Sequence, residues 1–198
     1  PIVDLLKDGD AEVRTQAVKV LGDLRIAYRQ PAVRELLKDP EPRVRYHALI
    51  ALGQLPDDRS TAADDLGKSA DAVIQAVLGF QGDDAYIRHA LAHALAAYLP
   101  DHLSPAMFEK LGNHPSAAVR TAFLLACRRV IGPERRAFEV RAFTHFLADP
   151  DAKIVDEAAR AVHDEDSAAL QQLAALAGKP NVPAAALDPA QLAGFRAD

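Results

Sequence analysis

The sequence predicts an all-α protein, a right-handed solenoid of about five antiparallel helix pairs. The first observation is a dipeptide, Val-Arg or Ile-Arg, that recurs along the chain in similar surroundings. Its second residue gives anchor positions separated by 31, 43, 32 and 35 residues: Arg14, Arg45, Arg88, Arg120 and, in a divergent last copy, Val155. Self-similarity at periods of about 30 to 45 residues is the signature of stacked helical repeats.

The second observation is the helical spacing of apolar residues at each anchor. In the second copy Val44, Ala48, Leu49 and Leu52 recur at intervals of three and four, which is the period of a helix with one buried face. We therefore expect one helix at each anchor, called helix B, over residues 11–24, 42–55, 84–99, 115–131 and 151–163.

A turn precedes most of these helices. Asp-Pro or Asp-Gly begins at Asp8, Asp39 and Asp149, and His114-Pro115 takes that place in the fourth copy. Proline lacks a backbone N–H and disfavours a helical conformation in the residue before it, so it ends the upstream helix. That upstream helix is helix A of each pair. The first helix A is expected to be incomplete, because the chain begins inside it.

Two stretches depart from the repeat. Residues 56–72, rich in Asp, Ser and Ala, are predicted to form a loop leading into a helix at about 69–80, and the sequence does not indicate whether this acidic loop has a function. One more helix is expected from Asp166 or Ser167 to Gly178. We place the solenoid at 1–178 and a Pro/Ala-rich linker or C-terminal tail at 179–198.

The anchor arginines are predicted to be structural. Each follows an apolar Val or Ile, and an aspartate stands at most of the turns. A charge that repeats with the unit normally serves the repeated interface. We expect a ladder in which the arginines reach turn carbonyls or turn aspartates of adjacent units: Arg14, Arg45, Arg88 and Arg120. Val155 in the last copy indicates that the ladder ends there.

The pattern D-P-x-x-x-V-R-x-x-A-x-x-A-L-G resembles the HEAT repeat, and its copies span most of the chain. Two stretches, DDAYIRHALAHAL and DAKIVDEAARAVHD, are also similar to the internal HEAT segment of large bacterial dehydrogenase-like proteins, in which a β-propeller precedes the repeats and a c-type cytochrome domain follows them. That likeness implies a domain fragment of a periplasmic protein. It carries over no cofactor and no catalytic residue, because the chain has no C-x-x-C-H haem site.

Composition limits the classes of function. The formal net charge is −5 and the pI about 5.8, so no overall positive field draws the chain to nucleic acid or anionic lipid. No run of about 18 apolar residues is present, and we expect no membrane insertion. The single cysteine, Cys127, excludes an internal disulfide framework. The start at Pro1, without Met or a signal peptide, favours a fragment.

Few residues suggest chemistry. His89 and His93 lie four apart, a spacing that suits a metal pair, but no Glu follows in the H-E-x-x-H manner and no third ligand is evident. Cys127 falls in a core column that holds leucine in other copies. A basic run could hold an anionic partner, although charges at helix C-termini explain it more simply: Arg128, Arg129, Arg135, Arg136 and Arg141. We predict no cofactor, metal or catalytic site.

The helix B positions one and five residues after the anchor predict the partner surface. They vary in type where the core columns do not, and stacking would gather them on one concave stripe: Tyr46, Ile50, His89, His93, Thr121 and Leu125. Tyr46 is the strongest candidate anchor, because an exposed tyrosine offers apolar area and a hydrogen bond together. Contacts through the loops or outer helices are the alternative.

The sequence therefore favours a non-catalytic interaction or inter-domain scaffold module, whose partner is a protein segment or a neighbouring domain of the parent chain. The alternative is an enzyme or nucleic-acid binder on HEAT-like repeats, such as the alkylpurine DNA glycosylases. A DNA-binding groove would be basic and rich in aromatic residues. A net charge of −5, no Trp and 6% aromatic residues oppose it.

Overall fold

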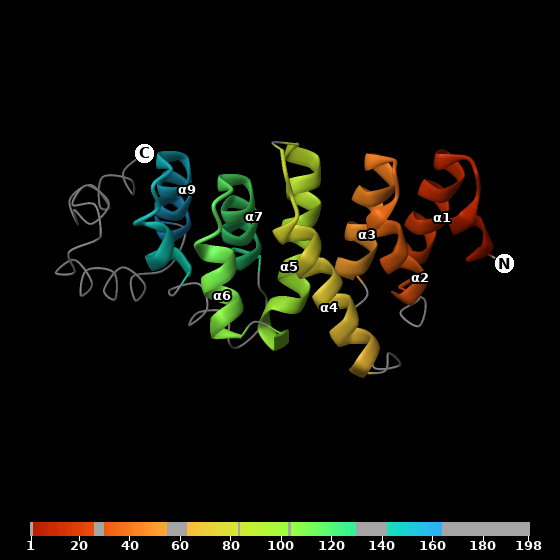
Figure 1. Cartoon of the computed structure of the whole chain (residues 1–198), viewed down its shortest axis with the longest axis horizontal. Coiled ribbons are helices and arrows are strands. Elements are labelled where there is room, and N and C mark those ends of the chain that lie inside the picture. Colours follow the sequence, from red (N-terminus) through yellow and green to blue (C-terminus); the bar gives the residue numbers. More distant parts are fainter. Residues whose placement is uncertain are drawn as a thin grey trace. The chain divides into compact units, whose positions relative to one another are not determined.

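The computed structural model describes residues 2–25, 30–54, 63–82, 84–102, 104–129 and 142–163. The chain forms two compact units, Pro1–Val130 and Ile131–Asp198. All regular secondary structure in the described ranges is helical (Figure 1). This confirms the predicted all-α solenoid class.

One layer of the first unit contains the predicted B helices: α1 (Ala11–Asp23), α3 (Pro42–Gln54), α5 (Ala85–His102) and α7 (Ala117–Cys127). They lie side by side in chain order, each packed on the next (Figure 1). The predicted boundaries of α1 and α3 agree to within one residue. Helix α5 continues beyond the predicted end at 99, and α7 is shorter than predicted at both ends.

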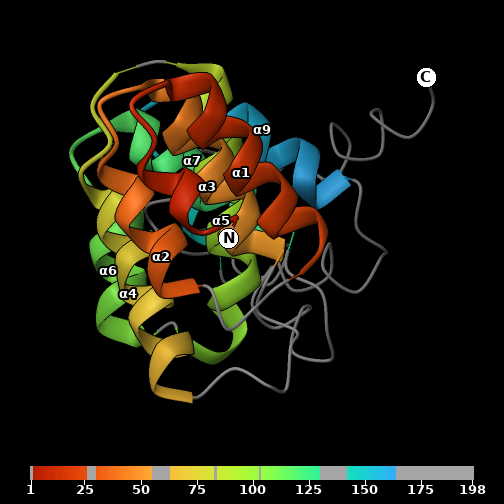
Figure 2. The ribbon, with the colours of Figure 1, turned by 90° about the vertical axis from the view of Figure 1, so that its right-hand side faces the viewer.

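The second layer of this unit contains the A elements: η1 (Asp4–Lys7), α2 (Gln30–Glu35) with η3 (Leu36–Lys38), α4 (Ala63–Leu78) and α6 (Pro105–Gly112). Figure 2 shows α2, α4 and α6 together on one side of the unit. The first A element is a single 3-10 turn.

The predicted loop over 56–72 is wrong in its second part. Helix α4 begins at Ala63 rather than near residue 69. The helical period of buried apolar residues in α4, such as Ala70 and Val73, extends upstream to Leu66, so the chain gains contacts by coiling earlier. Residues 56–62 lie outside the described ranges.

Small residues let the B helices approach closely. Gly22 of α1 lies against Ala51 of α3, and Gly53 of α3 lies against His93 and Ala94 of α5. A Cβ added at Gly53 would lie 2.7 Å from His93 Cδ2 and 3.1 Å from Ala94 Cα. In the first two repeats, the glycine of the Leu-Gly pair near the end of helix B therefore lies against the next B helix. A larger residue would not fit at this close contact.

Buried hydrogen bonds join α4 to α2 and α5 to α3. The Ser69 hydroxyl donates to Gln30 Oε1 at 2.7 Å and accepts from Arg34 Nη1 at 2.9 Å. Tyr98 of α5 donates to the Leu52 carbonyl of α3 at 3.0 Å, and burial raises the pKa of its hydroxyl. Because Gln30, Ser69 and Tyr98 are almost fully buried, these bonds satisfy groups that would otherwise be costly to bury.

The described part of the second unit is a helix pair of the same kind. Residues 142–146 are helical and α9 covers Ala152–His163. Phe143, Phe146 and Leu147 are buried, as are Ile154 and Ala158 of α9. The predicted helix ending at Gly178 and the predicted tail at 179–198 lie outside the described residues, so the boundary at 178 stays a prediction. Among the described helices, none has the length and hydropathy needed to cross a membrane.

Candidate functional site

Four turns before B helices share one capping bond. The residue six positions before the anchor accepts the backbone N–H two residues later, at 2.8 to 3.1 Å. In three turns the acceptor is an aspartate carboxylate, and in the fourth it is a histidine ring nitrogen: Asp8, Asp39, Asp149 and His114 Nδ1. The turn signal of the sequence is therefore a local side-chain cap, which His114 supplies in place of aspartate.

Three anchor arginines each donate to at least one backbone carbonyl of the turn before their own helix. Arg14 Nη1 donates to the Asp8 carbonyl at 2.8 Å, and Arg45 Nη1 to the Asp39 and Pro40 carbonyls at 2.8 and 2.9 Å. Arg120, which is almost fully buried, donates to His114 O at 2.7 Å. These carbonyls belong to the arginine's own unit, because the turn wraps past the first turn of helix B. Arg88 is half-buried, and its backbone N–H donates to Asp84 O.

Arg14 also reaches the next unit. Its Nε lies 2.8 Å from Asp39 Oδ2 and its Nη2 lies 2.9 Å from Asp39 Oδ1. The Arg14 guanidinium lowers the pKa of the Asp39 carboxyl, and the carboxylate raises the pKa of Arg14. Asp39 thus joins three groups: it caps its own turn, accepts Arg14 of the first unit and offers its carbonyl to Arg45.

The turn before α5 is built differently. Gly82 stands where Asp39 stands in the preceding unit, and its φ of 129° is a conformation that residues with a side chain rarely adopt. Asp84 caps α5 instead, accepting the Tyr86 and Ile87 N–H groups at 2.8 and 3.1 Å. In the described part of the chain, no carboxylate pairs with Arg45 Nε or Nη2 as Asp39 pairs with Arg14.

The six residues of the predicted stripe lie on the layer of B helices, but they differ in solvent exposure. His89 is exposed, whereas the other members are half-buried: Tyr46, Ile50, His93, Thr121 and Leu125. Thr121 donates its hydroxyl to the Ala117 carbonyl of its own helix at 2.8 Å. The concave shape of the stripe stays a prediction.

The two histidines of the stripe lie in a cationic neighbourhood. Arg129 Nη2 lies 3.3 Å from His89 Nδ1, and His93 Nε2 is buried against Gly53 with no hydrogen-bond partner. Burial, and then Arg129, lower the pKa of both rings. The described residues hold no group of three His, Cys, Asp or Glu that could bind a metal ion.

A groove between the first turns of α3 and α5 brings Tyr46 together with a residue that the sequence analysis missed. This tyrosine groove has a volume of about 420 Å³ and is lined by Pro42, Arg43, Tyr46, His47, Asp84, Tyr86 and Ile87. Tyr86 is 78% exposed, a large fraction for an aromatic side chain. The signal in the sequence that could have found it is an aromatic residue two positions after the capping Asp84.

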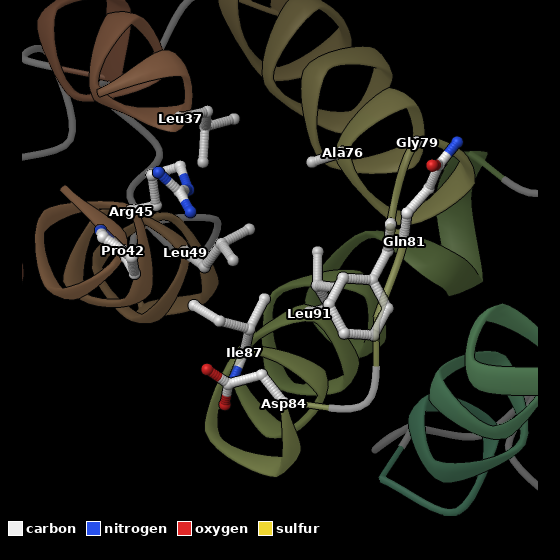
Figure 3. Close-up of a pocket in the computed structure, with 11 residues that line it drawn as sticks. Leu37, Pro42, Arg45, Leu49, Ala76, Gly79, Gln81, Asp84, Ile87 and Leu91 are labelled. Atoms are coloured by element: carbon white, nitrogen blue, oxygen red, sulfur yellow. The ribbon is translucent and has the colours of Figure 1, made fainter. Parts of the chain in front are cut away.

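A second hollow adjoins the tyrosine groove through Pro42, Asp84 and Ile87, which line both. This Arg45 pocket has a volume of about 540 Å³ between α3, α4 and α5 (Figure 3). Its apolar wall is formed by Leu37, Leu49, Phe80, Ile87 and Leu91, and its charged groups are Arg45 and Asp84.

Two candidates from the sequence remain, Cys127 and the basic run. Cys127 is a fully buried free thiol in the core of α7. Of the basic run, Arg128 and Arg129 follow α7, and Arg135, Arg136 and Arg141 lie outside the described residues. Binding of an anionic partner by this run therefore stays a prediction.

Comparison with known proteins supports the repeat assignment. Residues 1–77 match the sequence model of the family described as HEAT repeats, and no curated protein gives a significant match. The fold is similar to an archaeal HEAT-like repeats protein from Thermococcus onnurineus NA1, with a TM-score of 0.54 and 16% identity, covering 98% of this chain and 85% of that one. An engineered protein gives a TM-score of 0.51 and 19% identity, covering 97% and 93%. The predicted HEAT resemblance is thus confirmed, while the likeness to dehydrogenase-like proteins stays a prediction.

Proposed function

We propose that this helical-repeat chain is a non-catalytic interaction module that binds a protein segment across the first turns of α3 and α5. The observation that carries the proposal is the tyrosine groove, where two tyrosines from successive repeats border one hollow. The partner is a segment of another protein or a neighbouring domain of a larger parent chain, for which the module acts as a scaffold.

The chemistry of the groove suits a peptide. Tyrosines supply large contact area at low cost in side-chain entropy, and their hydroxyls pair with peptide backbone or polar side chains. Tyr46 is half-buried with its ring edge-on to His47, at a centroid distance of 4.9 Å, so its position is set before a partner arrives. Tyr86 is highly exposed and would lose most of its solvent contact on binding.

The stripe would extend this surface along α5. His89 lies one turn after Tyr86 on the same helix, and a longer partner would run from the groove over His89 toward Thr121 and Leu125. The net charge of −5 favours a protein partner over nucleic acid, because phosphate recognition needs a positive surface.

A displayed library of random peptides, selected on the immobilised 198-residue chain, tests this function. Peptides that enrich are synthesised with a fluorescent label, and their affinity is measured by anisotropy. We expect Tyr46→Ala and Tyr86→Ala each to weaken binding at least about fivefold with unchanged melting temperature, since removal of a contact anchor costs about 1 kcal/mol or more.

Lys110→Ala is the matched control, because Lys110 is exposed on α6 of the other layer. His89→Ala measures how far the site extends along the stripe. Selected peptides that bind the two tyrosine variants as tightly as the unchanged chain would place the site elsewhere. Failure to select any peptide would oppose the proposal itself.

A further inference from the structure

We propose that the Arg45 pocket binds the carboxylate of an aspartate in a partner protein segment. This inference rests on the proposed function, since it supposes that the partner is a protein. It concerns a different pocket, however, and names a specific chemical group of the partner.

The first step is a comparison of two equivalent arginines. Arg14 and Arg45 occupy the same position in consecutive repeats, and each donates Nη1 to two carbonyls of its own turn. Arg14 uses its remaining edge, Nε and Nη2, to hold both oxygens of Asp39 in the next repeat. The same edge of Arg45 has no described partner. The second repeat therefore keeps the arginine donor, and the residues that the structure describes include no acceptor for it.

The second step concerns the third repeat, whose described residues provide no carboxylate for this edge of Arg45. Gly82 takes the position of Asp39 in the third repeat, and its φ of 129° is a backbone conformation that residues with a side chain rarely adopt. Asp84 lines the pocket, but its Oδ1 accepts the Tyr86 and Ile87 N–H groups at the start of α5. In the described ranges, no hydrogen bond or ion pair joins this carboxylate to Arg45.

The third step is the shape of the surroundings. Arg45 extends from α3 between Leu37 and Leu49, across the hollow from Ile87 and Leu91 (Figure 3). The pocket thus presents a fork-shaped donor beside an apolar wall. A carboxylate that enters displaces water from both, and pairing with a guanidinium is strengthened where water is excluded.

The chain itself shows which segment fits such a donor. Asp39, the partner of Arg14, stands in Leu36-Leu37-Lys38-Asp39-Pro40, in which leucines precede the aspartate and proline follows it. A partner segment of this type would place its aspartate on Arg45 and its leucines against the apolar wall. The occupant we commit to is therefore an aspartate-containing segment with apolar residues on its N-terminal side.

The probe is a pair of blocked peptides, acetyl-LLKDPEP-amide and the same sequence with Asn in place of Asp. Binding of each to the isotope-labelled 198-residue chain is followed by NMR chemical shifts. We expect the Asp peptide to shift amides around Arg45, Leu49 and Ile87, and to bind at least about tenfold more tightly than the Asn peptide. This main comparison uses the unchanged chain, so it does not depend on whether any variant folds.

Variants of the arginine then assign the effect. In Arg45→Gln the two peptides should bind equally weakly, and Arg45→Lys, which keeps the charge but loses the fork, should fall between. Equal binding of the Asp and Asn peptides to the unchanged chain, or no binding of the Asp peptide at about 5 mM, overturns the inference. If library-selected peptides still depend on Tyr46 and Tyr86 in that case, the proposed function stands without it.

Discussion

Arg14 and Asp39 form a two-point ion pair that joins the first repeat to the second, with nitrogen–oxygen distances of 2.8 and 2.9 Å. Both side chains are largely buried, with exposed fractions of 12% and 5%. Arg43 and Glu12 also connect these repeats, at 2.6 Å, but their exposed fractions are 60% and 50%. One pair of repeats therefore contains a buried and an exposed ion pair that can be compared.

Asp39→Asn should lower the melting temperature more than Glu12→Gln does. Asp39 loses both an ion pair and part of its turn cap, whereas exposed pairs contribute within about 0.5 kcal/mol. Differential scanning calorimetry of the two variants gives the comparison. Combining Asp39→Asn with Arg14→Gln should cost less than the sum of the single changes. Equal losses in Asp39→Asn and Glu12→Gln would contradict a special role for the buried pair.

The lowered pKa of Asp39 predicts that the free energy of unfolding depends on pH in the acid range. Because Arg14 lowers the folded pKa of Asp39 below the unfolded value of about 3.9, the stabilisation is fully present above about pH 4. It is lost as the pH falls through the folded pKa. Urea unfolding between about pH 5 and pH 2.5 should therefore show a smaller decline in Asp39→Asn than in the unchanged chain. An identical decline in both would rule out Asp39 as a contributor.

Gly53→Ala should destabilise the chain by about 1–3 kcal/mol, because the new Cβ would overlap His93 and approach the Ala94 backbone. Gly67→Ala in α4 is the matched control, since nothing lies within 4 Å of a Cβ there. That change should stabilise by about 0.5–1 kcal/mol through helix propensity alone. Chemical unfolding of both variants measures the difference, and a stabilised Gly53→Ala would show that α3 and α5 do not meet closely.

The stability should fall as the pH is lowered from about 7.5 to 5. Burial lowers the folded pKa values of His47, His89 and His93, so below an unfolded pKa of about 6.5 the unfolded chain binds more protons than the folded one. His93→Gln should reduce this dependence, since His93 is buried against α3 with Nε2 unpaired. Urea unfolding of both proteins at three pH values measures how the free energy of unfolding changes with pH. The same change with pH in His93→Gln as in the unchanged chain would contradict this role of His93.

Tyr98→Phe should cost about 1 kcal/mol, because it removes the buried hydrogen bond to the Leu52 carbonyl. Tyr86→Phe is the control, since Tyr86 is 78% exposed and a hydroxyl there faces water. The difference in the free energy of unfolding between the two variants is the measured quantity. Similar values would mean that the Tyr98 hydroxyl bond does not stabilise the packing of α5 on α3.

Much of the fold could be predicted because the repeat makes its local rules visible several times. The aligned dipeptides predict a turn at Asp39 before α3 and at His114 before α7, and the structure adds that both side chains cap these turns. The start of α4 was missed because the Asp- and Ser-rich composition around it is typical of loops. Leu66 and the buried face that follows outweigh that preference.

The candidate site could be predicted only in part. Tyr46 could be predicted because it occupies a variable column on helix B, whereas Tyr86 lies in the first turn of α5, two residues before the anchor Arg88 and outside the columns that predict the stripe. The lack of a described partner for Arg45 depends on the turn at Gly82, whose φ of 129° cannot be read from the sequence. Such features occur once in the chain, where one repeat departs from the others, so aligning the repeats cannot predict them.

Hydrogen–deuterium exchange of the chain, with and without a library-selected peptide, tests most directly the claim that the partner binds across α3 and α5. Slowed exchange should be confined to amides in the first turns of these two helices, around Tyr46 and Tyr86, and should be absent in Tyr46→Ala at the same peptide concentration. Protection confined instead to α2, α4 and α6, with none in α3 and α5, would contradict the claim and place the binding surface on the other layer.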